Sequence, residues 1–239
     1  MSFHHIPVLL AECIDGLAIR PDGIYLDGTA GGAGHSKEIA ARLQTGRLIC
    51  LDQDPDAVAT ARERLAGLPA TVIQENFRNT AAVLDGAGVT GLNGALLDLG
   101  VSSHQLDETA RGFSYQGDAP LDMRMDQTDT LTARAVVNEW PQEELRRILW
   151  QYGEERYAPA VAGAIVRARD KRPIETTLEL VEVVKGAMPP AALREKQHPA
   201  KRTFQAIRIA VNDELGSVDR MVREAVPRLN PGGPVSYTH

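Results

Sequence analysis

The sequence has few of the features that mark membrane, secreted or metal-dependent proteins. No apolar run approaches the ~18 residues needed to cross a bilayer, and residues 1–5 do not begin a basic-then-apolar signal peptide. Only two cysteines, Cys13 and Cys50, occur in 239 residues, and they lie too far apart for a metal-binding pair. These absences predict a cytoplasmic protein without a transmembrane segment, a disulfide or a bound metal.

Positive charge is also scarce, since 26 Lys and Arg face 32 Asp and Glu and give a formal net charge of −6. Proteins that coat nucleic acid non-specifically need Lys and Arg to contact phosphates, so the composition disfavours that class. Basic residues nevertheless gather at 167–172 and 196–208. Such runs are either solvated surface or a local face for RNA, and the sequence leaves both interpretations open.

The first hundred residues alternate short apolar runs with helical stretches. We expect strands at 24–27, 47–52, 71–74 and 95–99, and helices at 36–43, 55–65 and 79–87. Ser36 is expected to cap the first of these helices, and Pro55 to open the second. Strands and helices alternating at this pace predict an α/β fold with a doubly wound parallel sheet.

After residue 99 the pattern changes to helices alone. No strand pattern occurs between 107 and 201. Apolar residues recur at helical spacing after Pro141 and from Tyr157 on, and Thr176 with Glu179 is typical of a capping box at the start of another helix. One long amphipathic helix is then expected from about 204 to 229, kinked or ended by Pro227. The predicted domains are 1–106, a helical insertion at 107–201, and 202–239 as a second, incomplete part of the first domain.

The strongest local motif is a glycine-rich turn at 28–34 that follows a strand ending in Asp27. Asp52 ends the next strand, where an acid typically accepts the ribose hydroxyls of a nucleotide cofactor. This spacing fits NAD as well as S-adenosyl-L-methionine. Lys37 stands where a dinucleotide fingerprint requires its third glycine, and an acid before the turn is more typical of methyltransferases, so the second cofactor is favoured.

Asp98 ends the fourth predicted strand. Ligands of open α/β sheets lie beyond the carboxyl ends of the strands, so we expect Asp27, Asp52 and Asp98 to point into one crevice. Each acid alone could equally be a turn or cap residue. Arg111 and Arg124 follow in a loop with aromatic neighbours, where they either contact RNA or hold a packed loop together.

These motifs together resemble the bacterial 16S ribosomal RNA cytosine-N(4) methyltransferase family. The matching segments are residues 5–10, 27–36, 51–55, 96–103, 105–107, 111–114, 120–125, 152–156, 198–200 and 202–206. The resemblance spans about residues 5 to 233. After Pro231-Gly232-Gly233 the family continues with a strand, a Ser-Phe-His-Ser-Leu-Glu-Asp segment and a basic tail, so this chain resembles a C-terminally truncated member.

The resemblance implies a Rossmann-like class I methyltransferase sheet with an inserted, mostly helical substrate domain. It implies S-adenosyl-L-methionine-dependent methylation of the exocyclic N(4) amine of a cytosine in the decoding region of 16S rRNA, with the small ribosomal subunit as partner. The family's cofactor contacts carry over to Ala33, Gly34, His35, Asp52, Phe77, Asp98 and Gln105. Ala33 stands where the family commonly has Gly, and a backbone contact would survive the added methyl group.

Asp98 is also the candidate catalytic residue, because a carboxylate at that position could accept the proton of the cytosine amine. The candidate RNA contacts are Arg111, Arg124, Lys201 and Arg202. Three other interpretations remain open: an NAD-dependent oxidoreductase, a non-catalytic RNA-binding module and a small-molecule methyltransferase. The large helical insertion suits a macromolecular substrate better than a small one.

Overall fold

The computed structural model describes residues 7–238, and the chain divides into two compact units. The sheet unit comprises residues 1–102 and 215–239, and the helical unit comprises residues 103–214. The sequence placed these boundaries after 106 and after 201. Both boundaries differ from those of the structure, and the second differs more because the helix at residues 201–211 packs against other helices of the helical unit. The first motif of the family resemblance begins at His5, outside the described residues.

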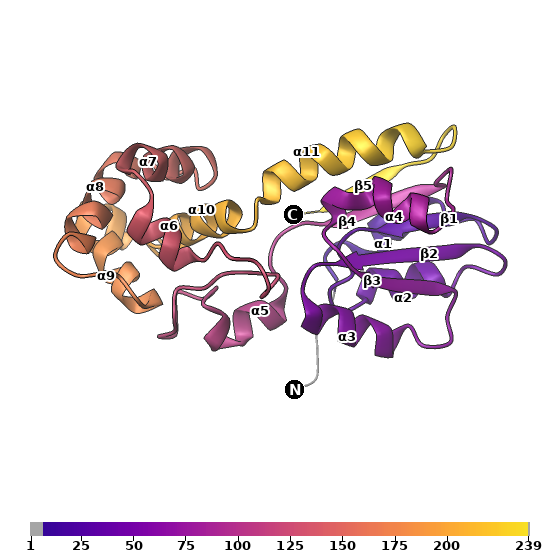
Figure 1. Cartoon of the computed structure of the whole chain (residues 1–239), viewed down its shortest axis with the longest axis horizontal. Helices are drawn as coiled ribbons and strands as arrows, with labels where there is room; N and C mark the ends of the chain where they lie inside the picture. Colours follow the sequence, from indigo (N-terminus) through magenta and orange to yellow (C-terminus); the bar gives the residue numbers. More distant parts are fainter. Residues whose placement is uncertain (1–6, 239) are drawn as a thin grey trace. The chain divides into compact units, whose positions relative to one another are not determined.

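The sheet unit is built on a parallel sheet with the strand order β3-β2-β1-β4-β5 (Figure 1). The strands are β1 (Ile24–Asp27), β2 (Arg47–Asp52), β3 (Ala70–Gln74), β4 (Gly94–Asp98) and β5 (Val235–Thr238). The first four confirm the predicted strands and the predicted α/β class. The fifth was not predicted within this chain, and it pairs in parallel with β4 from Ala95↔Val235 to Asp98↔Thr238.

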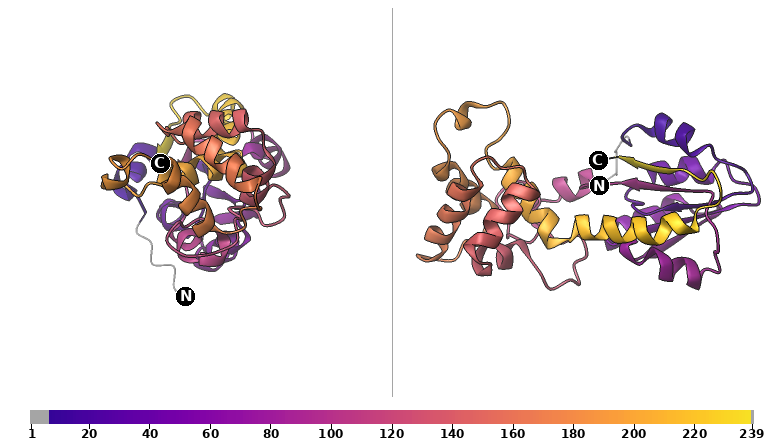
Figure 2. Two further views of the ribbon diagram at one scale, coloured as in Figure 1. Left: turned by 90° about the vertical axis from the view of Figure 1, so that its left-hand side faces the viewer. Right: turned by 90° about the horizontal axis from the view of Figure 1, so that it is seen from above.

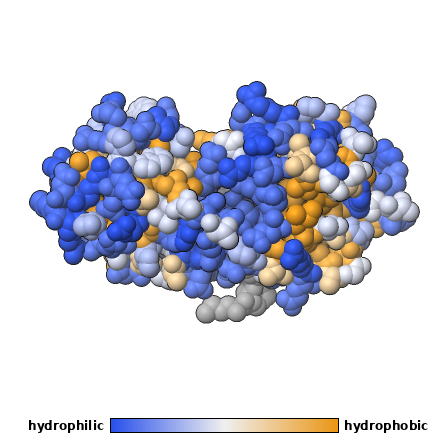
Figure 3. Space-filling model, in the orientation of Figure 1, coloured by the Kyte–Doolittle hydropathy of each residue, from blue (hydrophilic) through white to orange (hydrophobic). Residues whose placement is uncertain are grey.

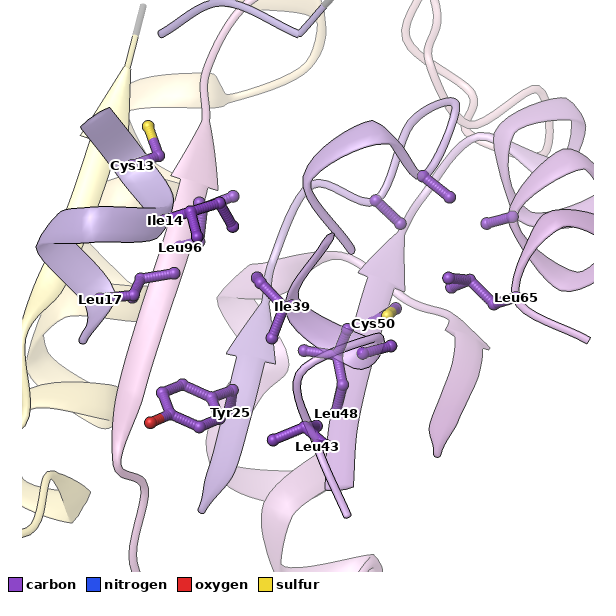
Figure 4. Packing of buried hydrophobic residues seen from close by; sticks show 14 residues of the cluster. Cys13, Ile14, Leu17, Tyr25, Ile39, Leu43, Leu48, Cys50, Leu65 and Leu96 are labelled. Carbon is purple, nitrogen blue, oxygen red and sulfur yellow. The ribbon is translucent and has the colours of Figure 1, made fainter. Parts of the chain in front are cut away.

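Helices cover both faces of this sheet (Figure 2). They are α1 (Leu10–Leu17), α2 (Gly34–Ala40), α3 (Pro55–Arg64), α4 (Thr80–Gly86) and α11 (Glu214–Ala225). Tyr25 and Leu48 pack with α1 and α2 in one buried cluster (Figure 4), whereas their neighbours Leu26 and Ile49 belong to a second cluster with α4 and α11. Successive residues therefore enter opposite cores, which explains why these strands are apolar throughout.

The helical unit contains no strand, as predicted, and all of its residues are described. Its helices are α5 (Ser103–Asp107), α6 (Ala133–Glu139), α7 (Gln142–Gln151), α8 (Ala158–Arg169), α9 (Thr177–Ala187) and α10 (Lys201–Val211). Leu145, Ile148 and Val161 are fully buried in its core. The capping box predicted at Thr176 and Glu179 is present at the start of α9.

Two local predictions were wrong. Ser36 does not cap α2, because that helix begins at Gly34 and Ser36 lies buried inside its first turn. The single helix expected over 204–229 is divided into α10 and α11 at Asn212 and Asp213. Asp213 has a left-handed φ of 45°, and the buried Asn212 side chain accepts the Met125 N–H at 2.7 Å and donates to the Met123 carbonyl at 2.8 Å.

No helix in residues 7–238 is long and apolar enough to cross a membrane. On the face seen in Figure 3, apolar residues gather over the sheet unit, and most residues of the helical unit are hydrophilic. Cys13 and Cys50 are both buried free thiols.

Candidate functional site

The glycine-rich turn runs from the end of β1 to the start of α2 and passes close to β4. The Gly28 N–H donates to the Leu96 carbonyl at 2.9 Å, and a Cβ at Gly28 would come within 2.6 Å of the Leu97 side chain. Gly31 and Ala33 have left-handed φ values of 49° and 60°. Glycine adopts this conformation freely, whereas at Ala33 the Cβ raises the free energy of the left-handed backbone by about 1 kcal/mol. The departure from glycine at Ala33 is therefore tolerated at a small cost in stability.

Asp27 holds this turn against α2 and is closed off from solvent. Its carboxylate accepts the Ser36 hydroxyl at 2.5 Å and the Thr29 N–H at 3.0 Å, and the residue is 1% exposed. Burial raises the pKa of the Asp27 carboxyl. Asp27 thus lies at the same sheet edge as Asp52 and Asp98, but its oxygens face the protein and position the turn.

Asp52 ends β2 and fixes the middle of the turn. One carboxylate oxygen accepts the Gly31 N–H at 2.8 Å, and the other accepts the Asp54 N–H at 2.9 Å. Burial raises the pKa of Asp52 to about 6, although these two N–H donors act to lower it. Each oxygen keeps a lone pair, so the carboxylate can accept two further hydroxyl groups.

Asp98 ends β4 and is only partly buried, with 27% of its side chain exposed. Its Oδ1 accepts the Thr238 hydroxyl at 2.6 Å, and its backbone N–H donates to Thr29 Oγ1 at 2.6 Å. Its Oδ2 lies 3.9 Å from His35 Nδ1. These contacts fix Oδ1 and the backbone while Oδ2 can accept a donor from a ligand.

His35 is buried in the first turn of α2, and its Nε2 lies 3.1 Å from the Val8 carbonyl oxygen. A carbonyl oxygen only accepts hydrogen bonds, so Nε2 carries the proton and Nδ1 faces Asp98. Phe77 begins a short 3-10 helix, Phe77–Asn79, and its Cβ is 3.2 Å from where a Cβ on Gly28 would lie. Both side chains therefore flank the turn.

Six of the seven predicted cofactor contacts thus lie in the sheet unit, around the ends of β1, β2 and β4. They are Ala33, Gly34, His35, Asp52, Phe77 and Asp98. Gln105 lies in α5 of the helical unit, where its side chain is buried. Sequence reasoning missed Ser36 and Thr238 as partners of Asp27 and Asp98, since neither spacing matches a known motif.

The two predicted RNA contacts in the loop are bound to the protein itself. Arg111 is 8% exposed and donates to the carbonyls of Arg124 and Met125, both at 3.0 Å. Arg124 forms a bidentate ion pair with Asp122, in which Nη2 donates to Oδ2 at 2.7 Å and Nε donates to Oδ1 at 2.8 Å. These bonds favour the alternative left open by the sequence, in which both arginines hold a packed loop together.

The other two predicted RNA contacts begin α10. Lys201 is exposed, and Arg202 is half-buried and donates to the Glu154 carbonyl. Arg202 and His198 line a hollow in the helical unit, and Lys201 precedes Arg202 in the chain. Among the four predicted RNA contacts, Lys201 is therefore the exposed one, and Arg202 is the one that lines a hollow.

A parallel sheet ordered β3-β2-β1-β4-β5, with a glycine-rich turn after β1 and an acid ending β2, defines a Rossmann-like nucleotide-binding unit. That class alone includes both oxidoreductases and methyltransferases. The model of the MraW methylase family matches residues 2–237, and the chain belongs to this family. It is a methyltransferase, as the sequence predicted, and the alternative of an NAD-dependent oxidoreductase is excluded.

Two relatives of this chain carry the same name. Ribosomal RNA small subunit methyltransferase H of Symbiobacterium thermophilum is 56% identical over 98% of this chain and 74% of its own length. The protein of the same name from Brevibacillus brevis is 54% identical over 99% of this chain and 76% of its own. Among solved structures, an rRNA methylase from Streptococcus thermophilus aligns with 48% of this chain and 70% of its own, at 19% identity and a TM-score of 0.34.

Proposed function

We propose that this chain methylates the exocyclic N(4) amine of a cytosine in the decoding region of 16S rRNA, with S-adenosyl-L-methionine as methyl donor. The name shared by relatives 52–56% identical to it supports small-subunit rRNA as the substrate. The observation that carries the donor site is the Asp52 carboxylate fixed to the Gly31 N–H at the end of β2. A ribosomal substrate also supports a cytoplasmic location.

The residues at this sheet edge fit the donor. Asp52 retains acceptor capacity for two ribose hydroxyls, and the turn at 31–34 brings backbone groups to the start of α2. Phe77 offers an apolar flank, and Gln105 is the contact proposed in the helical unit. The donor, when bound, supplies a methyl group activated by a positively charged sulfur.

Asp98 is proposed to handle the proton of the substrate. The cytosine amine is a weak nucleophile because its lone pair is conjugated into the ring. Asp98 Oδ2 would accept a hydrogen bond from this amine and take its proton as the methyl group passes from the donor sulfur to the nitrogen. The Thr238 hydroxyl holds Oδ1 at 2.6 Å and so fixes the direction of the carboxylate. The base must be unstacked to reach this carboxylate.

Donor affinity is expected to rise as the pH rises through about 6. Burial raises the pKa of Asp52 to about 6. Ribose hydroxyls stabilise the ionised carboxylate, so binding lowers this pKa and releases a proton near that pH. Well below it, affinity should fall by about tenfold per pH unit. Calorimetry between about pH 5 and 8 tests this, and a flat profile would contradict a role for Asp52 in holding the donor.

The proposed function is tested by transfer of tritiated methyl groups to 30S subunits and to naked 16S rRNA. We expect label in one cytosine, recovered as N4-methylcytidine after digestion. A non-catalytic RNA-binding module would retain the RNA without transferring label, and a small-molecule methyltransferase would ignore both substrates. Label on another base, or on large-subunit RNA alone, would reject the proposal.

A further inference from the structure

We propose that the RNA backbone docks on a basic rim of the helical unit, formed by Arg156, Arg194, Lys196, Lys201 and Arg202. This inference rests on the proposed function and names the surface that takes the substrate. Arg156 lies in the turn before α8, Arg194 and Lys196 lie in the segment before α10, and Lys201 and Arg202 begin α10 itself. The sequence alone could not choose between this segment and the other basic run at 167–172.

Two residues of the rim, Arg156 and Arg202, line the hollow beside α10. Arg156, Glu195, Gln197, His198 and Arg202 all line it, and Arg156 pairs with Glu195 at 2.7 Å. Arg194, Lys196 and Lys201 are sequence neighbours of these lining residues, and all three are exposed. The surface is therefore hollowed, with two arginines in its lining and three exposed cations next to lining residues in the chain, which suits a phosphate backbone.

Three of the five cations are available to a ligand. No described residue forms an ion pair or a side-chain hydrogen bond with Arg194, Lys196 or Lys201. Glu154 and Glu195 are the exposed acids of the same segments, and they are outnumbered by the five basic residues. In a chain with a net charge of −6, a local excess of positive charge is where phosphates would bind.

The segment that carries these cations is held rigidly. His198 Nδ1 accepts the Ala200 N–H at 3.2 Å, and the His198 ring stacks on Tyr115 with centroids 4.5 Å apart. Tyr115 in turn meets the edge of Phe204, which is buried in α10. Burial and nearby Lys185 lower the pKa of His198, so the ring stays neutral and keeps this acceptor. Rigid placement reduces the entropy lost when RNA binds.

Two arginines of the other basic run are used by the fold itself. Arg169 donates to the carbonyls of Val137 and Trp140 at 2.9 and 2.8 Å, which satisfies the end of α6. Arg172 pairs with Glu179 at the start of α9. By contrast, Lys201 and Arg202 lie in the first turn of α10, where the helix dipole disfavours cations. Contacts within the fold therefore account for Arg169 and Arg172, whereas helix stability does not account for Lys201 and Arg202.

The test compares two double variants of this chain with a control. In Lys196→Ala/Lys201→Ala two cations of the rim are lost, whereas Lys196→Arg/Lys201→Arg keeps both charges. Lys171→Ala removes one exposed cation from the other run. Affinity for a 16S rRNA transcript is measured by fluorescence anisotropy from about 50 to 200 mM salt. Calorimetry with S-adenosyl-L-methionine checks that each variant is folded.

We expect the alanine pair to bind RNA about tenfold more weakly, with the slope of log affinity against log salt smaller by roughly 1.4 to 1.8. The arginine pair and Lys171→Ala should keep the original slope. In methylation assays the alanine pair should raise KM and leave kcat unchanged. The inference is overturned if the alanine pair keeps its slope, or if Lys171→Ala lowers it as much. Absence of methyl transfer by the original chain would instead reject the proposed function.

Discussion

Replacing Asp52 with alanine is expected to weaken S-adenosyl-L-methionine binding by about a hundredfold or more, because two effects combine. The first is loss of the acceptor for two ribose hydroxyls, and hydrogen bonds to a charged group contribute about 1.5–3 kcal/mol each. The second is loss of the bonds from the Gly31 and Asp54 N–H groups, which hold the turn in its bound shape. Without these bonds the turn would be flexible, and the entropy lost when it becomes ordered would reduce the affinity for the donor.

Calorimetric titration of the donor measures this effect. Asp52→Asn provides a graded comparison, since it keeps the size of the side chain and removes the charge. Glu63→Ala is the matched control, because Glu63 is an exposed acid on the neighbouring helix α3 and should not alter affinity. If Asp52→Ala binds the donor as tightly as Glu63→Ala does, the donor site is not at the end of β2.

The strands of the sheet could be predicted because each carries its own signal. Residues 95–98 are almost wholly apolar and end in an acid, and the structure covers them on both faces. The division between α10 and α11 could not be predicted in this way. Apolar residues recur at helical spacing on both sides of Asn212, and the break depends on bonds from Asn212 to the backbone of residues 123 and 125. Contacts with residues so distant in the sequence do not change the hydrophobic periodicity, so the pattern cannot reveal them.

The candidate site shows the same limit. Spacing placed Asp52 and Asp98 at strand ends, because parallel strands bring their carboxyl ends to one edge. It could not show that Asp27 faces inward, since that depends on the Ser36 hydroxyl nine residues later in α2. Nor could it show that Arg111 is buried and bonded to the backbone whereas Lys201 is exposed. Residue type predicted the chemistry of the site, and tertiary contacts decided which groups remain available.

Replacing Asp98 with asparagine is expected to lower kcat for methyl transfer by roughly 10²- to 10⁴-fold, the usual contribution of a positioned proton acceptor. Asparagine can still accept the Thr238 hydroxyl at the position of Oδ1, so the local fold should persist. Its amide would present either a weak acceptor or a donor to the cytosine amine, and neither can take up the proton.

Single-turnover methylation of 30S subunits at saturating donor separates this role from simple donor binding. If Asp98 only contacts the donor, Asp98→Asn will raise the dissociation constant of the donor and leave the saturated rate unchanged. If it accepts the proton, the saturated rate will fall. Thr238→Val is the matched control, because it frees Oδ1 without removing the charge and should reduce the rate far less. The two variants thereby test the orientation of the carboxylate and its role as proton acceptor separately. A full rate in Asp98→Asn would remove this residue from the chemical step.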